Sequence, residues 1–391
     1  MASDDAAQVL ISGFRGSGKT TELKRLEKWL ERDGFSVVFI DTEEYLNLRM
    51  PATISDLWIS IAAGFDDFLQ RALQGPHAIG KFWERFRAFL DREIVVSDVK
   101  INLADVGEFK VALRENPAFR VQLNEALEAK RPKLVHECRD FVEEGIAALR
   151  QLRLNTQGTV IIIDSFEKLA GEARTADDVR ASAEVLFTRD WRLLQAPCNT
   201  IYTVPPWLAF TDAAADNELG RTLLMPMCKV REKHGGPCEA GIAALLDLLG
   251  RRMDVQAIFG DDTAIRPLIE MSGGYPRDLL RMVRDVLIRN IEVVALPIPR
   301  EKLDATVLRV IQVYAEQYET GLDGEDLPLL TRIAREKEIS GWTRKDKFRV
   351  AELFDHHFVL SYQNGERWLD LHPLLRDTPS MQKELRGKTG D

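Results

Sequence analysis

The sequence predicts an α/β fold in which a parallel sheet carries a glycine-rich loop and a helical insertion, followed by a helical domain and a small C-terminal domain. Three observations predict the sheet and the insertion. A short apolar run at 9–11 is followed by glycines and then by leucines at helical spacing. A second apolar run, 160–163, ends in Asp164, as the buried strands of a parallel sheet do. Between 57 and 154 the pattern becomes helical and highly charged.

Composition narrows the class of protein. The chain has 391 residues and a net charge of -9, which fits two or three globular domains and disfavours a protein that coats nucleic acid. Four cysteines argue against a disulfide framework, and Cys228, His234 and Cys238 lack the fourth ligand of a zinc site. No apolar run approaches the roughly 20 residues of a membrane span, and the N-terminus has no signal-peptide pattern, so we expect a cytoplasmic protein.

The first element is the segment 8–21, QVLISGFRGSGKTT. A buried strand leads into the pattern G-x-x-x-x-G-K-T, and the helix that follows ends near Gly34. This is the strand, loop and helix context of a phosphate-binding loop, in which left-handed glycines turn backbone N–H groups toward a polyphosphate. We expect left-handed backbone at Gly13, Gly16 and Gly18. We expect nucleotide contacts from Gly13, Phe14, Arg15, Gly16, Ser17, Gly18, Lys19, Thr20 and Thr21.

The chemistry of this loop predicts ATP and Mg²⁺ as its ligands. Lys19 would reach the β- and γ-phosphates, and the hydroxyl of Thr20 would hold Mg²⁺. The second acidic ligand would come from Asp164, at the carboxyl end of its strand, where open parallel sheets bind ligands. Ser165 stands where a glutamate often follows, so Glu167 is the candidate base that activates water. The alternative for Glu167 is a solvent-facing acid at a helix start.

The strand predicted at 36–40 should complete a βαβ unit and lie beside the first strand. The insertion, about 55–155, is interpreted as a cap over the sheet, with a surface for a partner or a second subunit as the alternative. Another strand, 200–204, offers a polar residue to the γ-phosphate or the attacking water: Thr203 first, Asn199 second. A further strand within 222–230 precedes a helix at 239–253.

Arg277 follows Pro276 at a predicted helix start, where the helix dipole disfavours a cation. A bound γ-phosphate would explain an arginine at this position; a plain surface arginine is the alternative.

The segments GFRGSGKT, IIIDSFEKL, YTVPPW and GGYPRDLL together resemble AAA+ ATPases over about residues 8–290. The resemblance is greatest to the STAND and NACHT-like signalling ATPases and to the origin-recognition initiators. It implies that Asp164 and Glu167 form a D-x-x-E variant of the second motif, that Thr203 lies on the sensor-1 strand, and that Arg277 is the sensor-2 arginine of the lid.

The C-terminal residues 323–391 predict helices followed by a hairpin at Asn364 and Gly365, the order of a winged helix. Its second helix would start after Thr343 and could present basic residues to DNA phosphates. These are Arg344, Lys345, Lys347 and Arg349. Because 323–391 contain 12 Lys and Arg against 13 Asp and Glu, a packing or protein-contact module is favoured over DNA binding. His356 and His357 are interpreted as ordinary helix-end residues.

We therefore expect a nucleotide-binding domain at 1–235, a helical lid at 236–300 and a winged-helix-like domain at 301–391. The favoured function is a slow ATPase switch, with a protein partner or self-association, in a regulatory or assembly subunit of a bacterial antiviral defence or conflict system. The alternative is a DNA-binding ATPase of the initiator or transposition-regulator kind. If subunits share a site, the candidates for an arginine finger are Arg174, Arg189, Arg192 and Arg221.

Overall fold

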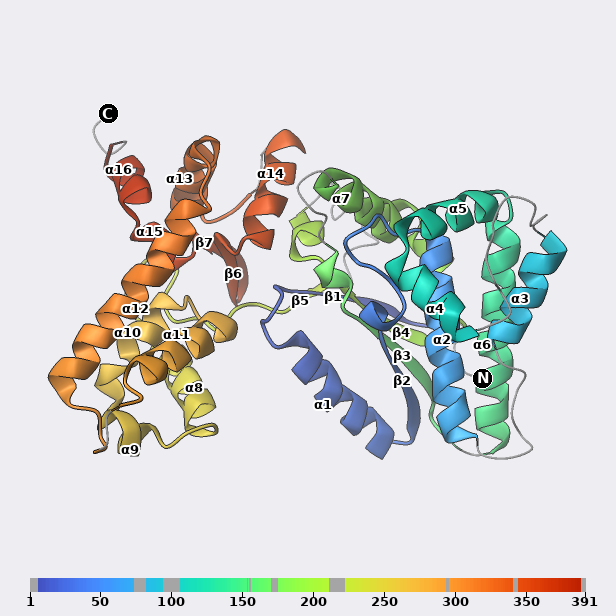
Figure 1. The fold of residues 1–391 in the computed structure, drawn as a ribbon, viewed down its shortest axis with the longest axis horizontal. Helices are drawn as coiled ribbons and strands as arrows, with labels where there is room; N and C mark the ends of the chain where they lie inside the picture. Colours follow the sequence, from blue (N-terminus) through green and yellow to red (C-terminus); the bar gives the residue numbers. More distant parts are fainter. Residues whose placement is uncertain are drawn as a thin grey trace. The chain divides into compact units, whose positions relative to one another are not determined.

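The computed structural model describes residues 6–73, 82–93, 106–152, 154, 156–169, 175–210, 222–292, 295–339 and 344–387. The chain divides into two compact units. Unit 1 comprises residues 1–13 and 19–224, and unit 2 comprises the loop 14–18 and residues 225–391. Figure 1 shows the elements of both units in chain order.

Unit 1 is built on a five-stranded sheet in the order β2-β3-β4-β1-β5, with every neighbouring pair parallel. Its strands are β1 (Gln8–Ser12), β2 (Phe35–Asp41), β3 (Gly158–Asp164), β4 (Asn199–Val204) and β5 (Thr222–Leu224). The predicted α/β class with a parallel sheet is confirmed.

One prediction about the sheet is wrong: β2 does not lie beside β1. It pairs with β3, while β1 pairs with β4 and β5. The physical reason lies in the burial of β3, of which every residue after Gly158 is buried and Ile161, Ile162 and Ile163 are fully so. A strand that is apolar on both faces takes a central place, and the partly exposed β2 is left at the edge.

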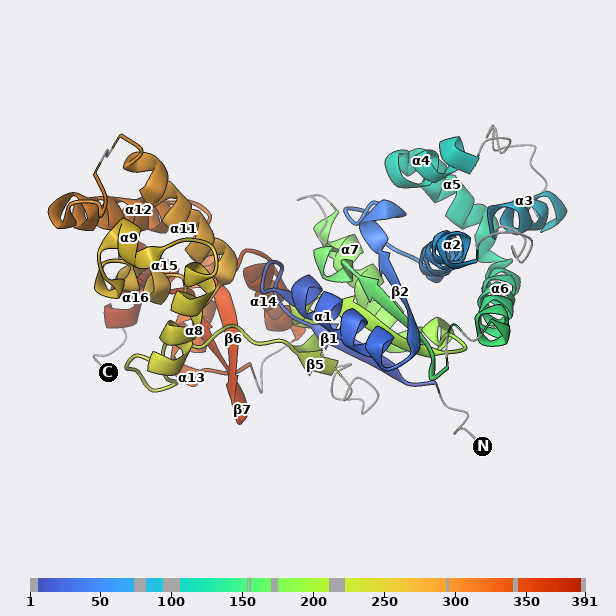
Figure 2. The same cartoon turned by 90° about the horizontal axis from the view of Figure 1, so that it is seen from below.

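Helices cover both faces of this sheet. On one face, Leu23 of α1 (Lys19–Arg32) packs with Val37 of β2 and with Ile162 of β3. The opposite face carries α2 (Ile54–Ala72), where Gly64 allows close approach because an added Cβ would lie 2.7 Å from Ile40 Cγ1. Figures 1 and 2 show α1 and α2 on opposite sides of the strands.

The predicted helical insertion is present in the described residues, as α2 to α6. It packs on the face of the sheet that α2 covers. After α2 it contains α3 (Phe82–Glu93), α4 (Val106–Glu115), α5 (Pro117–Glu128) and α6 (Arg131–Gln151), and α7 (Ala176–Glu184) follows β3. Aromatic rings join these helices: Phe82 of α3 lies 5.5 Å from Phe141 of α6, and Phe109 of α4 lies 5.6 Å from Phe119 of α5. These ring contacts pack the helices against one another, and Figure 2 shows α2 to α6 grouped together beside the sheet.

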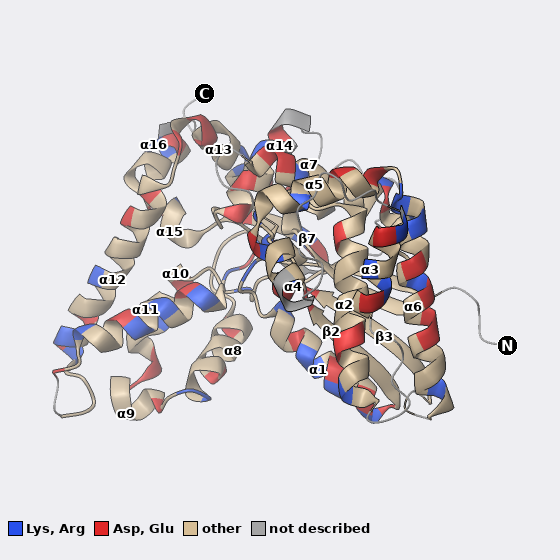
Figure 3. Cartoon of the chain, turned by 45° about the vertical axis from the view of Figure 1, so that its right-hand side comes forward, with Lys and Arg blue, Asp and Glu red and all other residues tan. Residues whose placement is uncertain are grey.

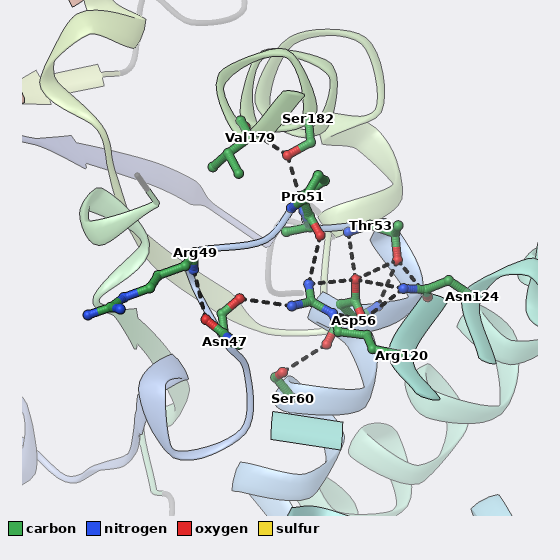
Figure 4. Close-up of polar contacts among 11 residues, drawn as sticks. Asn47, Arg49, Pro51, Thr53, Asp56, Ser60, Arg120, Asn124, Val179 and Ser182 are labelled. Carbon is green, nitrogen blue, oxygen red and sulfur yellow. Dashed lines mark hydrogen bonds and ion pairs between the residues drawn. The ribbon is translucent and has the colours of Figure 1, made fainter. Parts of the chain in front are cut away.

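A buried ion pair fixes the insertion to the segment that follows β2 (Figure 4). The Arg120 guanidinium of α5 donates through Nε and Nη2 to the Asp56 carboxylate of α2, at 3.1 and 3.0 Å. It also donates to the carbonyls of Asn47, at 2.8 Å, and Pro51, at 2.9 Å. The Asp56 carboxylate also accepts hydrogen bonds from the Thr53 N–H, at 2.9 Å, and from Asn124 Nδ2, at 3.2 Å. Both side chains are at most 2% exposed, so protein groups satisfy the charges in place of water.

The described residues of unit 2 form mostly helices, together with the β6-β7 hairpin. The elements of unit 2 are α8 (Glu239–Gly250), α9 (Val255–Phe259), α10 (Arg266–Met271), α11 (Pro276–Arg289), α12 (Arg300–Thr320), α13 (Leu327–Glu336), α14 (Arg344–Asp355), β6 (Val359–Asn364), β7 (Glu366–Leu371), α15 (Pro373–Arg376) and α16 (Pro379–Gly387). The core unites Leu245 of α8, Leu279 of α11, Leu303 of α12 and Leu374 of α15. The predicted antiparallel hairpin is present, with Gly365 at a φ of 88° in its turn.

Charges of both signs are interspersed on the helices of both units, as Figure 3 shows for α3, α6, α11 and α12. Among the helices of the described residues, none is both long and apolar enough to cross a membrane.

Candidate functional site

The glycine-rich loop begins at the end of β1, where the chain leaves the sheet before α1. Lys19, the first residue of α1, is 3% exposed, and its Nζ donates to the Gly13 carbonyl at 2.8 Å. The same Nζ lies 3.4 Å from Glu167 Oε1, so the two residues predicted as phosphate ligand and base form a buried ion pair. Burial lowers the pKa of Lys19, and the carboxylates of Glu167 and Asp164 oppose this shift.

Asp164 is the last residue of β3 and lies beside the first turn of α1. Its Oδ2 accepts a hydrogen bond of 2.7 Å from the hydroxyl of Thr20. Among the described residues, Asp164 Oδ1 and Glu167 Oε2 are buried and have no hydrogen-bond partner. Buried carboxylate oxygens without a partner are costly, and oxygen ligands of this kind suit Mg²⁺. The residues present therefore fit a divalent cation held by Thr20 and Asp164.

The turn that carries Glu167 has an unusual backbone. Ser165 is left-handed, with a φ of 79°, and a short 3₁₀ turn, Phe166–Lys168, follows it. Thr203, near the end of β4, is fully buried, and its hydroxyl accepts a hydrogen bond of 3.2 Å from the backbone N–H of Phe166. The sequence suggested that Thr203 touches phosphate or water; the structure places its hydroxyl on the backbone of the turn.

Two of the three loop glycines are left-handed: Gly16 has a φ of 86° and Gly18 a φ of 102°. The expectation of left-handed backbone at Gly13 is wrong, because Gly13 continues from the strand and only its carbonyl is used, as the acceptor for Lys19. At Gly16 an added Cβ would lie 2.7 Å from Arg277 Nε and 2.9 Å from Tyr275 Oη. Gly16 is therefore required both by its backbone and by these two neighbours in unit 2.

The loop residues 14–18 pack within unit 2. Phe14 is 1% exposed, and its ring meets Phe354 of α14 edge-on at 5.3 Å. The Arg15 carbonyl accepts a hydrogen bond of 2.6 Å from Tyr275 Oη and lies 3.2 Å from His357 Nε2. The rings of Tyr275 and His357 stack at 4.7 Å. Burial lowers the pKa of His357 to about 4, so this ring is neutral at pH 7.

Sequence reasoning missed Tyr275, Phe354 and His357 as neighbours of the loop. The signal available was Tyr275 directly before Pro276 and Arg277, since a residue preceding a helix start can lie over a neighbouring loop. His357 was interpreted as an ordinary helix-end residue, and the structure corrects this, because its ring contacts the loop carbonyl.

The remaining predicted contacts are distributed as follows. The Ser17 hydroxyl is buried without a hydrogen-bond partner among the described residues, whereas Thr21 is exposed on α1. Asn199 lies at the opposite end of β4 from Thr203, with its Oδ1 accepting from the Ala7 N–H, so it cannot serve the loop. Of the arginine-finger candidates, Arg189 and Arg192 are described, and the other two, Arg174 and Arg221, lie outside the described residues.

The proposed DNA-contacting helix is α14. Its Arg349 forms ion pairs with Asp326, with Asp323 at 3.5 Å and with Glu352 at 3.4 Å. This arginine is therefore occupied by acids of its own unit. The side chains of Arg344, Lys345 and Lys347, and the predicted N-cap Thr343, lie outside the described residues. Within the described part of the chain, no cluster of His, Cys, Asp and Glu could hold a metal through three or more such residues.

No protein-family model and no curated protein sequence matches the chain. It is similar to the solved structure of the Aeropyrum pernix ORC2 protein, at 10% identity, covering 99% of this chain and 89% of that one, with a TM-score of 0.41. It is also similar to Drosophila ORC bound to DNA, at 13% identity, 97% and 81% coverage and a TM-score of 0.37.

A third similar structure is the Thermotoga maritima RuvB Holliday junction branch migration motor, at 13% identity, 98% and 88% coverage and a TM-score of 0.35. At these values the likeness adds nothing to what the sheet order and the loop themselves show.

Proposed function

We propose that this chain binds ATP with Mg²⁺ at the loop between β1 and α1 and hydrolyses it slowly, as a nucleotide-driven switch of the AAA+ type. The observation that carries the proposal is the convergence of Lys19, Thr20, Asp164 and Glu167 at the carboxyl edge of a parallel sheet. Each is a residue type that phosphoryl transfer requires at such a loop.

These contacts support the following proposed roles. The left-handed backbone at Gly16 and Gly18 directs N–H groups to the phosphates, and Lys19 holds the β- and γ-phosphates in place of Glu167. Thr20 and Asp164 would hold Mg²⁺, and the bound ion would supply positive charge next to the phosphates. Glu167, released from Lys19, orients the attacking water and accepts its proton.

Unit 2 supplies the response to nucleotide. Arg277 lies against Gly16 of the loop, where it would sense a γ-phosphate, and the helices 236–300 and the region 301–391 would act as lid and winged-helix-like domain. In this proposal, the bound nucleotide regulates the binding of a protein partner or self-association. A role in bacterial defence or conflict comes from the resemblance to STAND ATPases and is part of the proposal only on that basis.

DNA binding by an initiator-like or transposition-regulator-like ATPase is the second candidate function. The hairpin after α14 favours it, whereas the ion pairs of Arg349 count against it. Hydrolysis stimulated by duplex DNA, with a steep dependence on salt, would favour this candidate.

Titration with ATP and ADP, in the presence of Mg²⁺, tests the proposal. Wild-type protein should bind both nucleotides, and Lys19→Ala should lose binding by at least about a hundredfold, since a buried charged contact to phosphate is removed. Lys28→Ala is the matched control, because Lys28 is an exposed lysine of the same helix. Equal affinities of Lys19→Ala and wild-type protein would overturn the proposal.

A further inference from the structure

The turn after β3 places both acids of the candidate site, yet its backbone is unfavourable. Ser165 has a φ of 79°, in the left-handed region that residues with a Cβ disfavour. Asp164 precedes this residue and Glu167 follows it two positions later, so a change at Ser165 would redirect one carboxylate relative to the other. Something outside the turn must hold this conformation.

Two buried threonines hold the turn from the strands on either side of β3. From the β2 side, Thr42 Oγ1 donates to the Asp164 carbonyl at 2.8 Å. From β4, Thr203 Oγ1 accepts from the Phe166 N–H at 3.2 Å. Both threonines are 0% exposed, so water cannot replace either hydroxyl.

We propose that Thr203 is a positioning residue for Glu167, which it sets through the backbone N–H of Phe166. This inference rests on the proposed ATPase function, in which Glu167 is the base. The Phe166 ring is fully buried and meets Phe187 edge-on at 5.8 Å, so ring and N–H together fix the residue that precedes Glu167. Thr203 thus acts one residue away from the base, without touching phosphate.

The geometry explains why a threonine suits this place. The hydroxyl supplies the acceptor that the buried Phe166 N–H needs, and the β-branched side chain has few rotamers within a strand. Thr203→Ser keeps the acceptor, whereas Thr203→Val keeps the shape and removes it. Thr200→Val is the matched control, because Thr200 is a buried threonine of the same strand whose hydroxyl has no hydrogen-bond partner among the described residues.

The first measurement is hydrogen exchange of the Phe166 amide in nucleotide-free protein. In Thr203→Val this amide should exchange at least about tenfold faster than in wild-type protein, while in Thr203→Ser and Thr200→Val it should stay within about twofold. Unchanged exchange in Thr203→Val would overturn the inference whether or not the protein hydrolyses ATP.

The second measurement separates binding from chemistry. Thr203→Val should lower kcat about tenfold or more with the Kd for ADP and for a non-hydrolysable ATP analogue unchanged, and Thr203→Ser should restore most of kcat. If Thr203→Val instead loses affinity for the ATP analogue but not for ADP, Thr203 contacts the γ-phosphate and the inference is wrong. A wild-type kcat in Thr203→Val would show that catalysis does not need the hydrogen bond from the Phe166 N–H to Thr203. Absence of nucleotide binding in wild-type protein would refute the proposed function, while the exchange result would still stand for the turn.

Discussion

Replacement of Glu167 by glutamine tests the buried ion pair of the loop. Lys19 Nζ lies 3.4 Å from Glu167 Oε1, with side chains 2% and 3% exposed. At an effective dielectric constant of about 20, the Coulomb attraction at this separation is about 5 kcal/mol. Desolvation of both groups offsets most of it, and we take about 1.4 kcal/mol as the net strength.

Two effects of opposite sign follow for Glu167→Gln. Because nucleotide no longer competes with the carboxylate for Lys19, ADP should bind about tenfold more tightly, which is the factor that about 1.4 kcal/mol represents. Because the base is lost, ATP hydrolysis should fall by about 10² or more. Isothermal titration and phosphate release measure the two quantities separately.

Glu31→Gln is the control for this experiment, since it makes the same charge change on an exposed face of α1. It should leave both quantities unchanged. Hydrolysis by Glu167→Gln at the wild-type rate would refute the assignment of the base, and weaker ADP binding would refute the competition for Lys19.

Three further predictions concern stability. Arg120→Met leaves Asp56 buried without its partner and should lower the free energy of unfolding by about 3–5 kcal/mol in denaturant titration, while the exposed Arg87→Met should change it by less than about 0.5 kcal/mol. Gly16→Ala forces a Cβ into left-handed backbone and against Arg277, and should cost about 1–2 kcal/mol, whereas Gly250→Ala, with open space around it, should be neutral or stabilising; equal effects would refute the reasoning. Burial lowers the pKa of His357 to about 4, below its ordinary value of about 6.5. As the pH falls, His357 is therefore protonated in the unfolded chain at a higher pH than in the folded chain. Stability should therefore fall by up to about 3 kcal/mol as the pH drops from about 6.5 to 4, and His357→Asn should flatten this fall.

The strands and the loop could be predicted because their signals are local. The apolar run before Asp164 specifies a strand, and Gly16 and Gly18 specify left-handed backbone, each from a few neighbouring residues. The order of the strands could not be predicted in the same way. The pairing of β2 with β3 depends on which strand is buried on both faces. The apolar runs of the sequence do not show which strand will be buried more deeply in the folded sheet.

The candidate site shows the same limit. Lys19, Thr20 and Asp164 were named from their motif, and the structure brings them together through a parallel sheet. The contact of Thr203 with the Phe166 N–H depends on the left-handed backbone of Ser165, which orients this N–H. No residue type in the sequence indicates that orientation. Contacts of this kind arise from tertiary structure and leave no periodic or motif signal in the sequence.

In the proposed function, Lys19 and Glu167 both serve ATP hydrolysis. The most direct test measures Mg²⁺-dependent phosphate release from ATP by wild-type protein, Lys19→Ala and Glu167→Gln, with and without duplex DNA. Wild-type protein should release phosphate slowly, at a rate that DNA does not change, and both variants should lose this activity. Nucleotide binding and release that persist in Lys19→Ala would contradict the proposed function.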